Sequence, residues 1–366
     1  MKRKDFIISS IALSLTSVTA GSFFLFSYSK KKALHWVKLN NKKVRCTLCP
    51  HYCILSDGER GKCRTRENLN GTLYSLSYNH PASINIDPIE KKPFFHFLPG
   101  SLSFSIATAG CPLRCKYCQN WTISQSYPEE LKSYFFTPYD IVNLSKKYKT
   151  PTIAFTYSEP VAFYEYMFEI SKIAKPRGIK PIAITSGFFS PKSIVQILQY
   201  LSAVKVDLKS FSNSFYEKIV GGKLKPVLRT IEIIKKSGVW LEIVYLVIPT
   251  LNDSEKEIRE LSKWIIKNIG NSVPIHFSRF FPQYKMKNLP PTPIKTLERA
   301  YSIAKEEGLK FVYIGNVFGH KHESTYCPNC GKVLIKRIGY KIIENNITSD
   351  GKCKFCKTKI EGIWKK

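Results

Sequence analysis

Acidic side chains are scarce in this sequence. The 366 residues include 27 Asp and Glu but 57 Lys and Arg, which gives a formal net charge of +30 at pH 7. The excess is mostly lysine and is dispersed along the chain. An anionic partner (nucleic acid, a membrane surface or an acidic protein) accounts for such a charge, and so does a solvated lysine-rich surface. Because the chain has no arginine-rich arm or basic recognition helix, we do not expect nucleic acid to be a partner.

A clear signal-peptide cleavage box is also absent from the N-terminal region. Residues 6–28 carry no charge, follow the basic start MKRKDF, and are long enough to span a bilayer. We therefore expect residues 1–32 to form an uncleaved membrane anchor. The alternative is an export signal. In that case Val18-Thr19-Ala20 is a weak cleavage site, and Arg3-Lys4 resembles a twin-arginine signal in which lysine replaces one arginine.

The central one of three cysteine sets lacks a fourth member. Four thiolates can close a tetrahedral metal site, so the two outer sets are interpreted first as structural. Three thiolates leave one metal position open, and chemistry takes place at an open position. The spacings in so long a chain indicate metal ligands rather than disulfides, which implies assembly in a reducing compartment. The sets are Cys46, Cys49, Cys53 and Cys63; Cys111, Cys115 and Cys118; and Cys327, Cys330, Cys353 and Cys356.

Short apolar runs alternate with helix-like segments from about residue 102 onward. The runs include SFSIAT, TIAFTY and VKVDL, and several helical segments open at a Pro or Ser typical of a helix start. This alternation predicts an α/β fold, a partial or full parallel (β/α) barrel, with small Cys-rich metal modules at both ends. The expected divisions are 1–32, the anchor or signal; 33–98, a Cys-rich module; 99–320, the barrel; and 321–366, a second Cys-rich module.

The two outer cysteine sets differ in how well their spacing identifies a metal. The C-terminal CPNC and CKFC pairs are arranged as in a zinc ribbon, so we predict Zn²⁺ there, with a rubredoxin-like iron as the alternative. The N-terminal set allows zinc or a second iron–sulfur cluster. We favour zinc or a purely structural role, because the spacing matches no cluster motif. His51 can replace one of the four cysteines.

The central set lies in GCPLRCKYC, directly after the first predicted barrel strand, where barrel enzymes build their active sites. The spacing is CxxxCxxC with Tyr117 before the third cysteine, and the alternative is a structural site that borrows a histidine. The motif resembles the cluster loop of radical S-adenosylmethionine (SAM) enzymes. This resemblance implies a [4Fe–4S] cluster on the three cysteines, with SAM on the fourth iron and Tyr117 near the adenine. One electron then cleaves SAM to a 5′-deoxyadenosyl radical that abstracts hydrogen.

Further stretches resemble the radical enzyme of the AmmeMemoRadiSam system, a group similar to the pyruvate formate-lyase activating enzymes. The resemblance covers about residues 45–340 and implies an enzyme with an unidentified substrate and a reductant such as flavodoxin or ferredoxin. It places the catalytic part on the cytoplasmic side, where electrons and SAM are supplied. The stretches are CTLCPHYC, DPIEKKPFFHFLPG, CQNWTISQ, FTYSEP, VYLVIPTLND, HFSRFFPQYKM and VYIGNV.

Two alternatives to that function remain open. In one, the protein activates a glycyl-radical enzyme, so that its substrate is the backbone of a partner protein. In the other, it is not an enzyme but an iron–sulfur electron carrier or a metal-stabilised binding module. An electron carrier needs neither an open iron nor a barrel, so the central set argues against it.

Glu159 is the first of several candidate SAM ligands outside the cysteine loop. In FTYSEP it stands where radical SAM enzymes usually carry Gly-Gly-Glu. The resemblance implies that its carboxylate meets the SAM ammonium group, although both glycines are absent. A loop glutamate that caps the following helix is the alternative.

The other candidates follow later strands. Ser186, in ITSGFF, is expected to contact the SAM carboxylate or ribose, or to be an ordinary turn residue. Asp207 and Lys209 point to one side if their strand continues, and the resemblance suggests that they contact SAM; a surface ion pair is the alternative. His276 is expected to face the barrel lumen as a cofactor contact, with a core histidine as the alternative.

Overall fold

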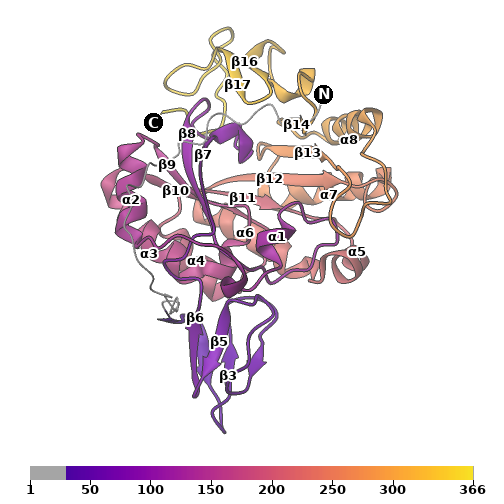
Figure 1. Cartoon of the computed structure of the whole chain (residues 1–366). Coiled ribbons are helices and arrows are strands. Elements are labelled where there is room, and N and C mark those ends of the chain that lie inside the picture. The colour runs from indigo at the N-terminus through magenta and orange to yellow at the C-terminus, as the bar shows by residue number, and fades with distance from the viewer. Residues whose placement is uncertain (1–29, 366) are drawn as a thin grey trace.

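The structure, a computed structural model, describes residues 30–365, and its largest element is an eight-stranded sheet (Figure 1). Seven strands, β8 to β14, are parallel neighbours in chain order, and β7 pairs antiparallel with β8. The predicted α/β fold with a mostly parallel sheet is therefore confirmed. In the described residues the edge strands β7 and β14 do not pair, so the sheet stays open. The strands are β7 (Ser83–Pro88), β8 (Leu102–Ala107), β9 (Thr152–Phe155), β10 (Lys180–Thr185), β11 (Ala203–Asp207), β12 (Trp240–Val247), β13 (Ile275–Arg279) and β14 (Val312–Gly315).

Helices connect successive parallel strands and cover the outside of the sheet (Figure 1). Several begin where the sequence carries a cap: the Ser190 and Ser254 hydroxyls accept main-chain N–H groups of the first turn, and Thr137 does so with a proline next to it. The α-helices are α1 (Trp121–Ser124), α2 (Pro138–Lys147), α3 (Tyr164–Ala174), α4 (Pro191–Leu198), α5 (Asn213–Phe215), α6 (Leu224–Ser237), α7 (Glu255–Ile269) and α8 (Ile294–Glu306). Other helical turns are η1 (Ile89–Lys91), η2 (Pro128–Glu130), η3 (Pro160–Phe163), η4 (Lys175–Arg177), η5 (Tyr216–Val220) and η6 (Lys321–Glu323).

The strands are buried on both faces, as their nearly continuous apolar sequences predict. Every residue of β9 is buried, and so are most residues of β11 and β12. One face packs against helices, where Ile170 of α3, Val227 of α6 and Leu261 of α7 have no exposed surface. This packing fixes the carboxyl ends of the parallel strands, from which the candidate site is built.

A small module precedes the large sheet, and another follows it. Figure 1 shows them at opposite ends of the molecule. The N-terminal module has two three-stranded antiparallel sheets, and the C-terminal module has one. The N-terminal strands are β1 (Lys31–Lys32), β2 (Trp36–Lys38), β3 (Val44–Cys46), β4 (Ile54–Leu55), β5 (Arg66–Leu69) and β6 (Thr72–Ser75). The C-terminal strands are β15 (Thr325–Tyr326), β16 (Val333–Ile338) and β17 (Lys341–Asn345).

The expected membrane anchorage is corrected by the structure. None of the helices formed by residues 30–365 is long and apolar enough to cross a membrane. The stretch 6–28, which prompted the expectation, and the alternative export signal lie outside the described residues. At the end of the predicted 1–32 segment, Lys31 and Lys32 pair with β6 and so belong to a sheet of the N-terminal module.

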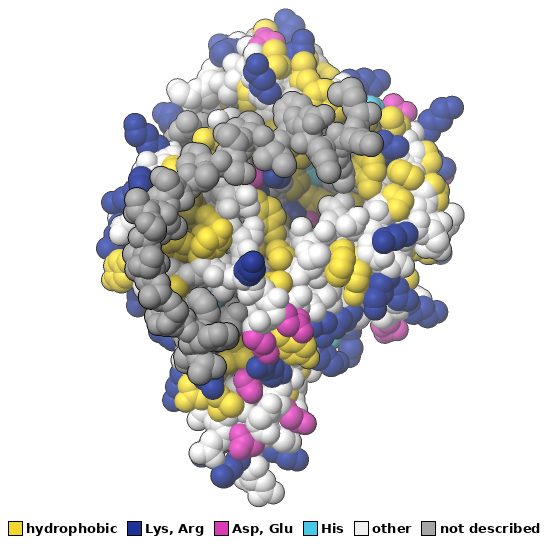
Figure 2. All heavy atoms as spheres, in the orientation of Figure 1, with side chains coloured by type: hydrophobic (Ala, Val, Ile, Leu, Met, Phe, Trp, Pro, Cys, Tyr) yellow, Lys and Arg dark blue, Asp and Glu magenta, His cyan; other side chains and the backbone are white. Residues whose placement is uncertain are grey.

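The positive charge is dispersed in space as it is in the sequence. On the face shown in Figure 2, Lys and Arg side chains are spread over the surface rather than gathered in one patch. Some of the basic groups are already paired with carboxylates, as Arg259 is with Glu307 at 2.6 Å. This distribution agrees with the solvated-surface interpretation of the net charge.

Candidate active site

The loop with the central cysteines follows β8 and is anchored on both sides by main-chain hydrogen bonds. The N–H groups of Arg114 and Lys116 donate to the carbonyls of Val220 and Ile219, at 2.8 and 3.0 Å. On the other side, Gly110 donates to the Ile123 carbonyl at 2.9 Å. The loop is therefore held over the carboxyl ends of the parallel strands, where the sequence places an active site.

The sulfur atoms of this loop lie in a site that disfavours free thiolates. Burial raises the pKa of Cys115 to about 12. Burial, followed by the negative charge of Glu159, raises the pKa of Cys111 as well. The Cys118 sulfur lies 3.2 Å from the Ser124 hydroxyl. Buried thiols become thiolates when a cation compensates their charge, so this donor set suits a metal.

Glu159 is brought next to the cysteine loop by the turn after β9. Its carboxylate is buried and accepts hydrogen bonds from the Thr185 hydroxyl and, at 2.8 Å, from the Ser186 N–H. Burial raises the pKa of Glu159. The carboxylate also accepts from the Val161 N–H of η3, but at 3.5 Å, so capping is a weak part of its role. A buried carboxylate oriented in this way suits an ammonium ligand.

Asp207 and Lys209 lie near the cysteine loop, because the charges of both affect the pKa of Cys115. The Lys209 ammonium is 3.2 Å from one Asp207 oxygen, and the Lys205 ammonium binds the other. Burial alone would raise the pKa of Asp207, but Lys205 and Lys209 outweigh it and lower this pKa to about 2. The charge of Lys209 lowers the pKa of the Cys115 thiol against the effect of burial. The pair is thus largely enclosed and faces the loop, unlike a solvated surface ion pair.

Among the described residues, two buried hydroxyl groups around this loop have no hydrogen-bond partner, namely those of Tyr117 and Ser158. Buried polar groups without partners are rare because desolvation is costly. Their position beside the cysteines and Glu159 indicates a polar ligand.

Comparison with known proteins decides the family. The profile described as the radical SAM superfamily matches residues 105–262. A pyruvate formate-lyase-activating enzyme of Clostridium pasteurianum is 30% identical over 170 residues, covering 44% of this chain and 68% of that protein. The chain belongs to the radical SAM superfamily.

Two further similarities extend the comparison. The uncharacterized protein MJ0808 of Methanocaldococcus jannaschii is 44% identical over 333 residues, which cover 90% of this chain and 99% of that protein. Among solved structures, Streptococcus suis SuiB bound to S-adenosylmethionine is similar with a TM-score of 0.48 and 12% identity, over 66% of this chain and 56% of that one.

Membership of the radical SAM superfamily implies a [4Fe–4S] cluster and SAM, and the residues present fit both. The three thiols provide an incomplete ligand set, which leaves one position for SAM. The hydroxyls of Tyr117 and Ser158, which have no partner among the described residues, provide hydrogen-bonding groups beside it. The carboxylate of Glu159 and the ammonium of Lys209 provide groups of both signs for a zwitterionic ligand.

The structure does not bring His276 to this site. His276 lies near the amino end of β13, and its Nε2 is 2.8 Å from a carboxylate oxygen of Glu242. The imidazole is buried between Phe95 and Tyr313, with ring centroids 4.7 and 4.9 Å away. The same Glu242 accepts the N–H groups of Phe95 and His96. These contacts correspond to the core-histidine alternative, at the end of the strands opposite the cysteine loop.

Two residues near the site were missed by the sequence analysis. Tyr157 has a φ of +62°, a conformation that favours glycine, and so occupies one of the two absent glycine positions in a glycine-like conformation. Its hydroxyl donates to Asp87 of β7, which also binds the Lys92 ammonium at 2.5 Å. Asp87 and Lys92 lie in the stretch DPIEKK, which resembles the family but predicts no role for either residue.

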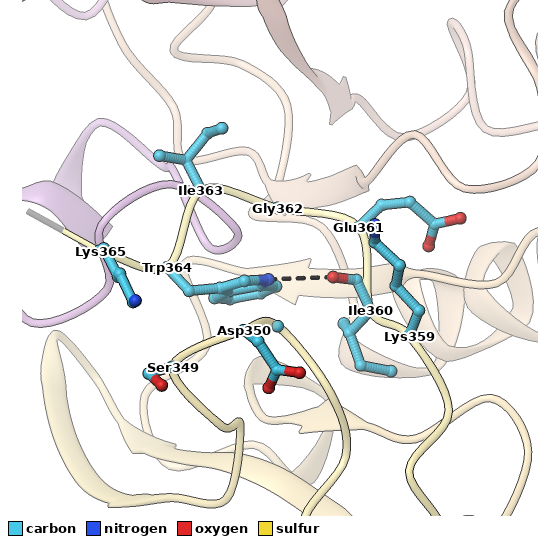
Figure 3. Close-up of a pocket in the computed structure, with 10 residues that line it drawn as sticks. Ser349, Asp350, Lys359, Ile360, Glu361, Gly362, Ile363, Trp364 and Lys365 are labelled. Atoms are coloured by element: carbon cyan, nitrogen blue, oxygen red, sulfur yellow. Dashed lines mark hydrogen bonds between the residues drawn. The ribbon is translucent and has the colours of Figure 1, made fainter.

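A hollow in the C-terminal module lies away from this site (Figure 3). It is formed by two segments of the C-terminal module around the Trp364 ring, whose indole N–H donates to the Ile360 carbonyl at 2.9 Å. None of its lining residues belongs to the cysteine loop or to the strand ends around it. The hollow therefore does not mark the candidate active site.

The four C-terminal cysteines converge in the same module. All four sulfur atoms lie within 4.8 Å of one another. Cys327 and Cys356 are 3.5 Å apart, and Cys330 and Cys353 are 3.8 Å apart. This arrangement can hold a single metal ion.

Proposed function

We propose that this radical SAM protein cleaves SAM reductively at Cys111, Cys115 and Cys118 and uses the resulting radical to remove hydrogen from a substrate. The observation that carries the proposal is the incomplete, partly buried thiol set with Glu159, Lys209 and unpartnered hydroxyls around it. When bound, the [4Fe–4S] cluster supplies one electron that splits SAM into methionine and a 5′-deoxyadenosyl radical.

The chain's own residues would bind and orient SAM. Glu159, fixed by Thr185 and the Ser186 N–H, accepts from the SAM ammonium group. Lys209 offers its ammonium to the SAM carboxylate, while Asp207 keeps it in place. The Tyr117 hydroxyl lacks a partner and is buried, so it is available to the adenosine part of the ligand. Holding SAM from several sides prevents the radical from reacting with water.

The test is SAM cleavage under anaerobic conditions. The full chain is reconstituted with iron and sulfide, reduced with dithionite, and supplied with SAM, and 5′-deoxyadenosine is measured by chromatography. We expect product from the wild type and none above background from a Cys115→Ala variant. Equal amounts from both proteins would refute the proposed function.

A second form of this function is supported by one comparison. The relative named as a pyruvate formate-lyase-activating enzyme suggests that the hydrogen is taken from a protein backbone. Incubation of the reduced enzyme with SAM and pyruvate formate-lyase then yields a glycyl-radical signal in electron paramagnetic resonance (EPR). Formation of 5′-deoxyadenosine without that signal would exclude this partner and leave the proposed cleavage intact.

We also infer that the C-terminal set holds Zn²⁺. A tetrahedral zinc with Zn–S bonds of about 2.3 Å places its sulfurs about 3.8 Å apart. The separations of 3.5 and 3.8 Å in this set support zinc rather than a larger cluster. Metal analysis should find one zinc ion per chain, and its loss in a Cys353→Ala variant assigns it to this set.

A further inference from the structure

The N-terminal module contains four cysteines that neither the radical chemistry nor the C-terminal metal explains. Cys46 ends β3, Cys49 and Cys53 lie in the following turn, and Cys63 precedes β5. All four are free thiols. Cys46 and Cys49 are buried, while Cys53 and Cys63 are partly buried.

Three of the four sulfur atoms receive a hydrogen bond from a donor of their own. Donors directed at sulfur stabilise the thiolate, which is the form that binds metals. Such hydrogen bonds also surround the sulfurs of iron–sulfur clusters and set their potential. The donors are the Arg66 guanidinium to Cys46 at 3.2 Å, the His51 N–H to Cys49 and the Lys62 N–H to Cys53. The Thr65 hydroxyl lies 3.4 Å from the Cys63 sulfur and donates to the Ala162 carbonyl at 2.6 Å. The hydrogen bonds to sulfur favour thiolates in the N-terminal set and therefore metal binding.

The spacing of the sulfurs separates this site from the C-terminal one. Among the described residues, the sulfur atoms of the C-terminal set all lie within 4.8 Å of one another, close enough to bind one metal ion. The N-terminal set does not converge in this way, although its thiols are near enough to raise one another's pKa values, as Cys46 does for Cys49 after burial. A single zinc ion needs sulfurs about 3.8 Å apart.

The sulfur positions of the central cysteine set can be compared with those of the N-terminal set. Its three sulfurs also fail to converge within 4.8 Å, and membership of the radical SAM superfamily implies a [4Fe–4S] cluster for them. A cubane attaches each thiolate to a different iron, so its thiolates lie farther apart than those on one ion. The N-terminal set resembles the central set in that its sulfurs do not all lie within 4.8 Å of one another.

We propose that Cys46, Cys49, Cys53 and Cys63 bind a second [4Fe–4S] cluster, in which protein thiolates ligate all four irons. The preference for zinc derived from the sequence is thereby reversed. A fully ligated cluster has no position for SAM, so its role differs from that of the central cluster. The proposal concerns metal content and is independent of whether SAM is cleaved.

The second cluster would lie directly against the loop that carries the first. Gly110, next to Cys111, is so close to the N-terminal module that a Cβ atom there would lie 2.4 Å from the Cys63 carbonyl oxygen. The His51 imidazole contacts the Pro112 carbonyl at 2.9 Å, and the Arg114 guanidinium donates to the Lys62 carbonyl at 2.5 Å. Two clusters held by adjoining loops interact magnetically when both are reduced.

The experiment counts metals in the full chain after anaerobic purification and reconstitution with iron and sulfide. We expect about eight irons and eight sulfides per chain, because each cubane contains four of each. A Cys46→Ala/Cys49→Ala/Cys53→Ala variant should retain about four irons, and so should a Cys111→Ala/Cys115→Ala/Cys118→Ala variant. Tyr52→Ala, an exposed change in the same loop, should retain the wild-type iron content.

EPR spectroscopy of the reduced proteins provides the second readout. The wild type should show a signal broadened by two neighbouring clusters, and each triple variant should show a narrower one. SAM should alter the signal of the N-terminal variant but not that of the central variant. Two zinc ions and about four irons per wild-type chain would overturn the proposal, as would a central variant without iron. If the N-terminal triple variant does not fold, the iron content of the central triple variant still decides the test.

Discussion

The N-terminal and C-terminal modules each present four cysteines on small antiparallel sheets, yet they are attached to opposite ends of the same parallel strands. The N-terminal module contacts the cysteine loop at the carboxyl ends, through Gly110 and Pro112. The C-terminal module contacts residues 95–98 at the amino ends, where Leu98 donates to the Ile363 carbonyl at 2.7 Å. An equal number of thiols therefore says little about role, whereas position and sulfur spacing say much.

Each module is secured by one buried arginine, and the two arginines differ in their partners. Arg66 forms an ion pair with Glu165 of α3, and both side chains are almost fully buried. Arg337 donates instead to neutral oxygens, the Phe95 carbonyl and the Thr325 hydroxyl, both at 2.8 Å. The N-terminal attachment therefore includes a buried ion pair, whereas the Arg337 guanidinium of the C-terminal attachment hydrogen-bonds to neutral oxygens.

The largest effect is expected from loss of the zinc ion proposed for the C-terminal set. Structural zinc sites contribute about 10–16 kcal/mol to the folding of small zinc modules. Cys353→Ala should therefore unfold the C-terminal module, which hydrogen–deuterium exchange would report as lost protection in residues 324–365. The N-terminal module should keep its protection. An equal loss in both modules would mean that they are not independent, contrary to the comparison.

The next effect concerns the two arginines. Arg66→Met leaves Glu165 buried without its partner, and breaking a buried pair in this way costs about 3–5 kcal/mol. Arg337→Met removes hydrogen bonds to neutral acceptors, for which about 1–3 kcal/mol is expected. Chemical denaturation of the two variants measures both losses. A larger loss for Arg337→Met would reverse the assignment of charge to the N-terminal attachment.

A smaller effect is expected from two matched glycine changes. Gly110 and Gly351 both have positive φ, at +90° and +80°. In Gly110→Ala the new methyl group collides with Cys63 and Thr65, whereas in Gly351→Ala it meets the Trp364 ring. We expect 5′-deoxyadenosine formation to fall at least tenfold, or about 1.4 kcal/mol, in Gly110→Ala. It should stay within about twofold of wild type in Gly351→Ala. Gly178→Ala, with φ +78° and open space around it, controls for backbone strain alone.

The smallest effect is a pH dependence that only the catalytic end should show. Burial raises the pKa of Glu159 above the ordinary range. As the pH falls through this raised pKa, the carboxylate is protonated and loses its attraction for an ammonium group, so SAM affinity should fall by up to about tenfold per pH unit. Calorimetric titration at several pH values measures this. Glu159→Gln should bind weakly without that dependence, whereas Cys353→Ala should retain it.

The sequence was sufficient for the features that depend on local pattern. Alternating apolar runs and helix caps predicted the α/β fold and its mostly parallel sheet, and CxxxCxxC after a strand predicted the family. The positions of Glu159, Ser186, Asp207 and Lys209 at strand ends followed from the same periodicity, and the structure brings them together. Their roles toward SAM stay predictions.

What the sequence could not give depends on long-range contacts. Period-two alternation placed His276 on an inner face. Its role as a core residue depends on its contact with Glu242, which lies on another strand and cannot be inferred from the local sequence. The contact between Asp87 and Tyr157 joins residues 70 apart, so neither stretch reveals it alone. The N-terminal spacing indicated no cluster motif, because the separation of the sulfurs depends on how the strands around them fold.

The pairing of residues 95–98 with the C-terminal module has a consequence for the order in which the protein folds. The His96 imidazole binds the Glu361 carbonyl, a contact between residues 265 positions apart. On the ribosome, residues 95–98 emerge long before their partners, so this end of the strands is covered last. Contacts of such long range form late because chain closure must precede them. The cysteine loop at the other end pairs with residues up to Lys285, whose N–H donates to the Lys116 carbonyl at 2.9 Å, so its contacts are all synthesised before residues 361–363.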